Sequence, residues 1–119
     1  MYSAQLLDHF EHPRNAGLVV NPDVNVQVEN PACGDILQLT LNVTNGNIAE
    51  IRFLAKGCVA AMACASALTE LVQGRTVEKA RSLRREEIVE AVGSLPEAST
   101  HASHLAMDAL AAALKQAKS

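Results

Sequence analysis

The chain has 119 residues, of which 49% are hydrophobic, and a formal net charge of −3. This length is expected to give a single domain over residues 1–119, and the charge provides no basic surface, so nucleic acid is not an expected partner. The three cysteines are an odd number, which argues against a disulfide framework, and the N-terminus lacks the pattern of a signal peptide. No apolar stretch is long enough to span a bilayer. We therefore expect a cytoplasmic protein with no membrane partner, whose thiols are free for metal binding or chemistry.

A short helix is predicted near the N-terminus. Ser3 can act as its N-cap, and Pro13 is expected to end it. Its apolar face is predicted to consist of Leu6, Leu7 and Phe10. His9 and His12 have no cysteine nearby in the sequence, so both are interpreted as surface residues.

Three strands of an antiparallel sheet are predicted next. Apolar and polar residues alternate over residues 24–28 and again over residues 37–43, which is typical of strands. Asn45-Gly46 is a strong hairpin signal, so a third strand over about residues 47–55 should return antiparallel to the second. Cys58 then lies at the step from this strand to the following helix.

The rest of the chain is predicted to be helical. One helix runs from about Val59 to Gln73 and is ended by Gly74. Thr76 can cap a short helix, Arg84–Val92 forms another, and Thr100 can cap the last one. Because the strands precede the helices, the fold class is α+β, with a three-stranded antiparallel sheet packed against several helices.

Four potential metal ligands lie at the ends of these elements: Cys33, Asp35, Cys58 and His101. Cys33 and Asp35 are separated by one glycine, so a tight turn could direct both side chains to one ion. Cys58 and His101 each lie at a predicted helix N-terminus, where the helix dipole favours thiolate and disfavours imidazolium. Two thiolates, one imidazole and one carboxylate would complete a tetrahedral shell. The carboxylate is the hard, weak ligand for a soft metal, so such a site should be exchangeable.

The spacing alone leaves other interpretations open, because no Cys-x-x-Cys or His-x-x-x-His pair anchors the set. Cys33 could be a half-buried structural thiol, Cys58 a small residue packed under its helix, and His101 a surface histidine. Cys64 falls in line with a stripe of leucine and valine and is expected in the core. His104 is expected to face solvent or to pair with an aspartate four residues further on.

Several segments, taken in chain order, resemble those of a known family. They are the opening over residues 2–17, the Asn30–Asp35 loop, the stretch from Phe53 through Cys58 to Gly74, and the stretch from Leu95 through His101 to Ala109. On these segments the chain resembles the iron–sulfur cluster assembly scaffolds of the IscU/NifU N-terminal type over nearly its whole length.

The resemblance implies an IscU-like fold and a scaffold or carrier role without enzymatic activity. In this role a [2Fe–2S] cluster is built with sulfur from a cysteine desulfurase and is passed to iron–sulfur acceptor proteins, while iron, or zinc in the apo form, can occupy the same place. By position, the resemblance assigns the site to Cys33, Asp35, Cys58 and His101, with the aspartate keeping the cluster labile. We expect a monomer or a weak homo-oligomer.

The sequence departs from the family pattern at two places. This chain has Ala102 where the family has a third cysteine, which is a ligand and a persulfide acceptor. The absence of this cysteine argues against sulfur acceptance and therefore against assembly of a new cluster on this chain. Residues 95–99 read Leu-Pro-Glu-Ala-Ser where the family's chaperone-recognition stretch reads Leu-Pro-Pro-Val-Lys. The zinc-dependent SufU branch, which has an additional loop between helices, fits less well.

Three functional hypotheses follow. The first is a scaffold or carrier that binds a cluster, iron or zinc at the four positions. The second is a zinc-dependent sulfurtransferase that accepts persulfide on Cys58 or Cys64, against which the missing third cysteine weighs. The third is a diverged interaction module stabilised by zinc. Asp35 favours the first over the third, because closed structural zinc sites rarely need a carboxylate.

Overall fold

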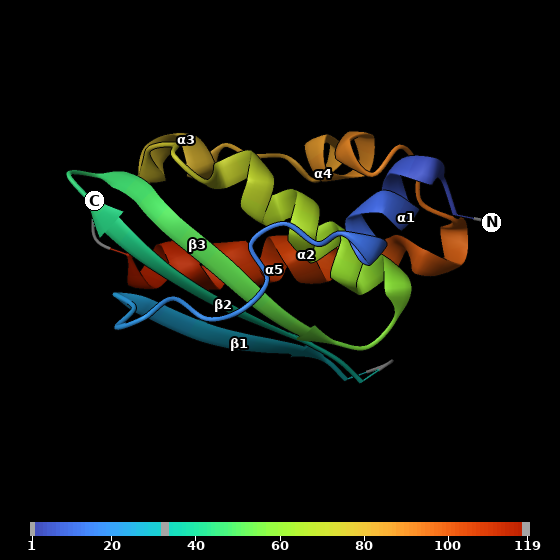
Figure 1. Cartoon of the computed structure of the whole chain (residues 1–119), viewed down its shortest axis with the longest axis horizontal. Coiled ribbons are helices and arrows are strands. Elements are labelled where there is room, and N and C mark those ends of the chain that lie inside the picture. The colour runs from blue at the N-terminus through green and yellow to red at the C-terminus, as the bar shows by residue number, and fades with distance from the viewer. Residues whose placement is uncertain (1, 32–33, 118–119) are drawn as a thin grey trace.

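The computed structural model of the protein describes residues 2–31 and 34–117. Within these residues, one antiparallel sheet has the strand order β1 (Val24–Asn30), β2 (Asp35–Thr44) and β3 (Asn47–Lys56) (Figure 1). The central strand β2 pairs with both neighbours, so apolar residues of the three strands align in rows across the sheet. The predicted α+β fold with a three-stranded antiparallel sheet is confirmed.

The alternation of side chains between the two faces of β2 determines on which face of the sheet its first residue, Asp35, lies. Leu37, Leu39 and Leu41 are each at most 2% exposed, and they lie on the face of the sheet that the helices cover. Asp35 has the same parity as these leucines, and successive side chains of a strand point to opposite faces. The strand therefore begins with a carboxylate at the end of a core row, on the side of the helices.

The hairpin between β2 and β3 forms at the predicted dipeptide. Asn45 and Gly46 have φ angles of 53° and 78°. Positive values at both positions are what a type I′ two-residue hairpin requires, and asparagine and glycine adopt them at low cost. Thr44 and Asn47 form the pair that closes the hairpin.

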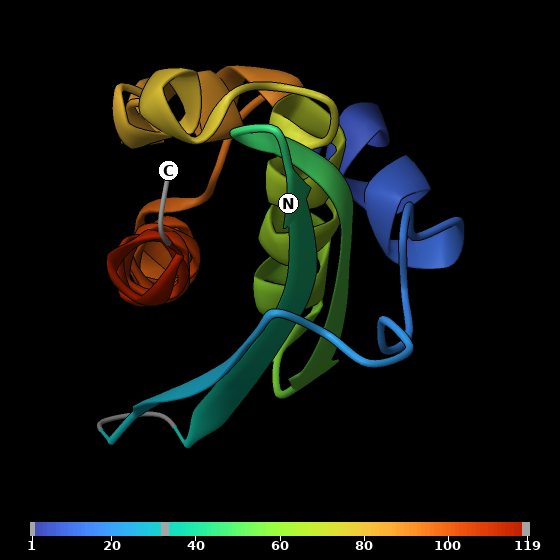
Figure 2. The same cartoon turned by 90° about the vertical axis from the view of Figure 1, so that its left-hand side faces the viewer.

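The two long helices lie over one face of the sheet, whereas the N-terminal helix, in blue, lies on the other side of the third strand from the last helix (Figure 2). Helix α2 (Val59–Val72) packs against β3, and α5 (Thr100–Gln116) packs against β1 and β2. The short helices α3 (Val77–Arg81) and α4 (Arg85–Ala91) both pack against α5, and the single turn η1 (Glu97–Ser99) leads into α5. Helix α1 (Ala4–Glu11) packs against α2. In the described part of the chain, no helix has the length and apolar character needed to cross a bilayer.

Helix α2 lies at the centre of the hydrophobic core. Its residues are mostly alanine, leucine and other small or apolar types, so it is apolar on nearly every side. Such a helix is stable only when it is enclosed, and here the sheet, α1 and α5 surround it. Gly74 follows α2 with a φ of 85°, which is the left-handed conformation that commonly ends a helix.

Two predictions about helix residues are wrong. In α1, Leu6 is buried as predicted, but Leu7 is 38% exposed and the other buried side chain is that of His9. Thr100 does not cap α5, since its hydroxyl donates a hydrogen bond to the carbonyl oxygen of Glu97 at 2.9 Å. The turn η1 runs directly into α5, so the first residue of α5 already lies inside a hydrogen-bonded turn.

Candidate metal centre

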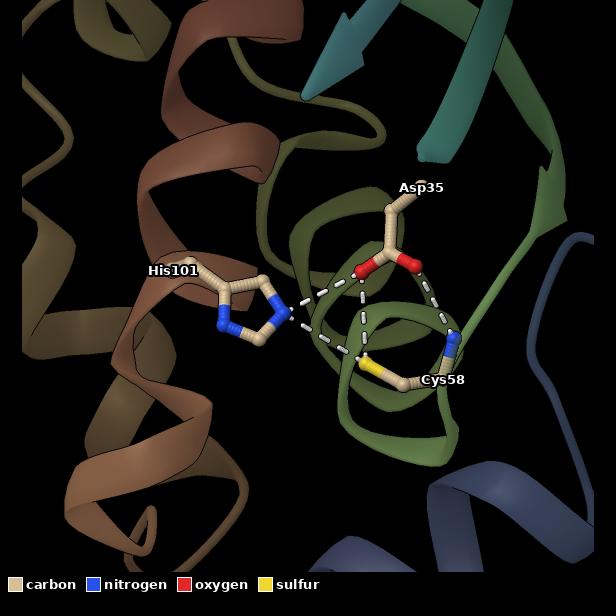
Figure 3. Close-up of side chains that lie close together, drawn as sticks. All are labelled: Asp35, Cys58 and His101. Atoms are coloured by element: carbon tan, nitrogen blue, oxygen red, sulfur yellow. Dashed lines mark hydrogen bonds and ion pairs between the residues drawn. The ribbon is translucent and has the colours of Figure 1, made fainter. Parts of the chain in front are cut away.

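Three of the four predicted ligands meet where β2 begins and β3 ends. Asp35 comes from the first position of β2, Cys58 from the N-terminus of α2, and His101 from the first turn of α5 (Figure 3). One ligand atom from each lies within 4.8 Å of the other two. Cys33, the fourth predicted ligand, lies outside the described residues.

The two carboxylate oxygens of Asp35 have different partners. Oδ1 accepts a hydrogen bond from the main-chain N–H of Cys58 at 3.2 Å. Oδ2 lies 3.3 Å from the Sγ atom of Cys58 and 3.2 Å from the Nε2 atom of His101. The residue is only 3% exposed. One oxygen is thus held by the main chain, and the other faces the two remaining donor atoms.

Cys58 is the N-cap of helix α2, as its place at the step from strand to helix predicted. Its backbone is extended, with φ −76° and ψ 163°. Its Sγ atom accepts a hydrogen bond from the N–H of Ala61 at 3.3 Å, in the way that a serine oxygen usually caps a helix. The same sulfur lies 3.7 Å from His101 Nε2. The helix start therefore fixes the direction of the thiol.

The separations of these donor atoms fit one tetrahedral ion. Zinc bonds of about 2.0–2.3 Å at tetrahedral angles place two ligand atoms about 3.3–3.6 Å apart. The observed separations are 3.2, 3.3 and 3.7 Å. A thiolate, an imidazole and a carboxylate suit zinc or iron, whereas calcium and magnesium take mainly oxygen ligands. The fold alone thus brings three donors of a tetrahedral shell into place.

The Cys58 thiol is in its protonated form at neutral pH. Burial is the largest influence and raises the pKa of Cys58, the Asp35 carboxylate raises it further, and the N–H groups of Ala61 and Ala60 lower it. The N–H groups of the helix N-terminus favour the thiolate, as expected, but burial and the neighbouring carboxylate outweigh them. A metal bound by the sulfur has to displace this proton.

The whole chain, residues 1–119, matches the family model described as the NifU-like N terminal domain. The chain belongs to this family. Over 114 residues, this NifU-like domain is 41% identical to the iron–sulfur cluster assembly scaffold protein IscU 1 of Archaeoglobus fulgidus, and the match covers 96% of this chain and 74% of that protein. Over 122 residues, it is 40% identical to the iron–sulfur cluster assembly scaffold protein IscU of Escherichia coli K12, with 99% and 94% covered. The resemblance found in the sequence is confirmed.

Solved structures share the fold of this NifU-like domain. A crystal structure of the N-terminal part of a nitrogen-fixing NifU-like protein from Brucella abortus superimposes with a TM-score of 0.78. The two chains are 20% identical, and the match covers 96% of this chain and 92% of the other. The shared feature is the arrangement of sheet and helices, which is the frame that brings Asp35, Cys58 and His101 together.

Ala102 is a buried residue of the NifU-like domain. It directly follows His101 in α5, is 1% exposed, and belongs to the hydrophobic core. A methyl group cannot bind a metal, so the described donors at this end of the sheet are those of Asp35, Cys58 and His101.

Cys64 and His104, which were also considered from the sequence, are not part of the group of donor atoms. Cys64 is fully buried in α2, as predicted, and burial raises its pKa to about 12. A thiol that is neither exposed nor ionised is a poor persulfide acceptor, so Cys64 does not suit that role. His104 is exposed on α5, which confirms its interpretation as a solvent-facing residue.

A second histidine of the NifU-like domain lies in a polar group that the sequence did not predict. His9, expected at the surface, is 5% exposed, and its Nδ1 atom lies 2.8 Å from the hydroxyl oxygen of Ser66 in α2. The main-chain N–H of Arg14 donates to the same oxygen at 2.9 Å. Burial lowers the pKa of His9, and Arg14 lowers it further. The available signal was a serine, Ser66, among the alanines of α2, because a buried hydroxyl needs a partner.

Proposed function

We propose that this chain is a scaffold or carrier protein for iron–sulfur cluster assembly and not an enzyme. It binds a [2Fe–2S] cluster, or iron or zinc, through Cys33, Asp35, Cys58 and His101. The observation that carries the proposal is the convergence of Asp35 Oδ2, Cys58 Sγ and His101 Nε2. The scaffold names of the relatives from Archaeoglobus fulgidus and Escherichia coli support it.

The donor set suits a centre that is loaded and then released. Stable iron–sulfur clusters are usually held by four thiolates. Here the proposed set contains two thiolates, and a hard carboxylate replaces another soft donor, which weakens the hold on a soft metal. Asp35 Oδ1 remains bonded to the main-chain N–H of Cys58, so the carboxylate can leave the metal without becoming unpaired.

The described donor atoms are arranged as in a site that holds a single metal ion. All three lie at separations that suit ligands of one metal. A [2Fe–2S] cluster has two irons that share four protein ligands, so at least one of the three must belong to a different iron from the others. Zinc or iron can therefore bind with little rearrangement, and a cluster requires the donors to separate.

The proposed partners follow from this role. A cysteine desulfurase supplies sulfur, and iron–sulfur acceptor proteins receive the cluster. The chain acts in the cytoplasm as one domain over residues 1–119, as a monomer or a weak homo-oligomer.

Anaerobic reconstitution tests the cluster proposal. The protein is incubated with ferrous iron and sulfide, desalted, and examined for bound iron, bound sulfide and visible circular dichroism. We expect about two irons and two sulfides per cluster-bearing chain. The Cys58→Ala variant should lose the signal, and the matched Cys64→Ala variant should keep it, because Cys64 is fully buried in the core and is not one of the converging donors. A colourless parent protein would exclude the cluster.

The fit of the donors to a single ion favours a second candidate, an interaction module stabilised by zinc. In that case zinc would be a permanent part of the fold, and its removal should lower the melting temperature markedly. Thermal unfolding is measured before and after treatment with a chelator. A melting temperature that does not change on chelation excludes the second.

A further inference from the structure

Gly57 directly follows β3 and lies beside Asp35, the first residue of β2. Ile36 of β2 pairs with Lys56 of β3, so one further step of the antiparallel register places Asp35 opposite Gly57. Residues opposite each other in such a pair project to the same face of the sheet. A side chain at position 57 would therefore point to the side on which the Asp35 carboxylate lies.

The space for a side chain at Gly57 is already filled by that carboxylate. A Cβ atom built on Gly57 would lie 2.1 Å from Oδ1, 2.6 Å from Cγ and 3.0 Å from Cβ of Asp35. These are the three nearest heavy atoms, and all belong to the one residue. The φ angle of Gly57 is 146°, a backbone conformation that residues other than glycine rarely adopt. The Asp35 carboxylate therefore packs directly against the main chain of Gly57.

This contact fixes which oxygen of Asp35 faces the donors. With the carboxylate packed against Gly57, Oδ1 reaches the N–H of Cys58 at 3.2 Å. Oδ2 is then directed to the Sγ atom of Cys58 and the Nε2 atom of His101. The side chain is thus held with one oxygen on the main chain and the other towards the two further donor atoms.

We propose that Gly57 is a positioning residue of the metal site: because it has no side chain, the Asp35 carboxylate can lie against the main chain with Oδ1 on the Cys58 N–H and Oδ2 towards the metal. This inference rests on the proposed metal-binding function. It predicts that a methyl group at position 57 damages the metal site through Asp35, even though residue 57 itself donates nothing to the metal.

The test compares metal binding and folding in a small set of variants of the full chain. Cobalt is the probe, because its visible absorption reports both the thiolate bond and the coordination geometry. We expect Gly57→Ala to lower cobalt affinity by about 10- to 100-fold, the range seen when residues that orient metal ligands are changed, and to alter the absorption bands. Gly74→Ala is the matched control, since Gly74 also has a positive φ, of 85°, but has open space around its Cβ position. That variant should lose some stability and keep the affinity and spectrum of the parent.

The double variant Asp35→Gly/Gly57→Ala separates the contact from general backbone strain. If the methyl group clashes with Asp35, Gly57→Ala should lower the melting temperature less in the Asp35→Gly background than in the parent. An equal loss in both backgrounds, or a Gly57→Ala protein that is folded and binds cobalt like the parent, would overturn the proposal. If Gly57→Ala does not fold, the double variant decides: folding supports the contact, and failure to fold contradicts it.

Asp35→Ala distinguishes this inference from the proposed function. If Asp35→Ala binds cobalt as tightly as the parent, the assignment of Asp35 as a ligand fails, and the role of Gly57 fails with it. If Asp35→Ala loses affinity while Gly57→Ala does not, only the inference about Gly57 fails.

Discussion

His9 and His101 both lie beside acids and polar side chains, but their surroundings differ in one respect. Around His9, the hydrogen bonds pair donors with acceptors: the Arg14 N–H donates to Ser66 Oγ, and the Ser66 hydroxyl hydrogen remains for His9 Nδ1. Around His101, a carboxylate oxygen, a thiol sulfur and an imidazole nitrogen, all common metal ligands, converge from a strand and two helices. A histidine next to an acid is therefore weak evidence for a metal site, whereas donor atoms that converge from a strand and two helices are strong evidence.

The largest expected difference between the two regions is in metal affinity. His101→Ala removes a donor and should weaken zinc binding by about 100-fold or more, since changes beyond the ligands alone already cost about 10- to 100-fold. His9→Ala should leave zinc affinity unchanged, because His9 takes no part in the group of three donors. Competition with a chromophoric chelator measures both. Equal losses in the two variants would mean that the regions are not separate.

Folding stability should show the opposite order. His9→Ala leaves a cavity beside Ser66 and should cost about 2 kcal/mol in the free energy of unfolding of the metal-free protein. His101→Ala should cost less, because the His101 side chain is 31% exposed. Urea unfolding in the presence of a chelator gives both values. A larger loss for His101→Ala than for His9→Ala would contradict this assignment of roles.

Proton release should also distinguish the metal site. Burial, reinforced by Asp35, raises the pKa of Cys58, so zinc must displace a proton from its sulfur at neutral pH. We expect zinc affinity to increase with pH and calorimetry in two buffers of different ionisation enthalpy to show this release. Cys58→Ala serves as the control and should release fewer protons. A release that is the same in parent and variant would show that the Cys58 proton is not displaced.

The smallest expected effect is the dependence of stability on pH through His9. Its pKa in the folded protein is lowered from the ordinary value of 6.5, so folding favours the neutral ring. The stabilisation is complete above pH 6.5 and is lost as the pH falls through the lowered pKa. The urea midpoint of the metal-free protein should therefore fall more between pH 7 and 5 than that of His9→Asn, whose side chain does not titrate. Parallel curves would rule out this contribution.

The parts of the fold that local sequence decides were predictable. Asn45-Gly46 forms the hairpin, Gly74 follows the long helix, and Cys58 caps that helix. Each of these depends on the backbone preference or capping ability of one or two residues. The parity of Asp35 with the core leucines also follows from the sequence once β2 is placed, so its direction towards the helices could be predicted.

The features that failed prediction depend on partners distant in sequence. His9 is buried because Ser66 of α2 receives it, and nothing within α1 indicates that contact. The thiol state of Cys58 depends on burial and on Asp35, which outweigh the local effect of the helix N-terminus. The ligand roles of Cys33, Asp35, Cys58 and His101 stay predictions, and the metal-binding experiments above test those of Asp35, Cys58 and His101.

The loop that follows α1 affects whether a strand from another chain can pair with the edge of the sheet. The Gly17 N–H donates to the Phe53 carbonyl oxygen at 2.8 Å, and the Phe53 N–H donates to the Asn15 carbonyl oxygen at 3.0 Å. Phe53 lies in β3, at the outer edge of the sheet, and an open strand edge can recruit a strand from another chain. At Phe53 the loop occupies both outward-facing backbone groups, so a strand from another chain cannot pair with β3 at this position.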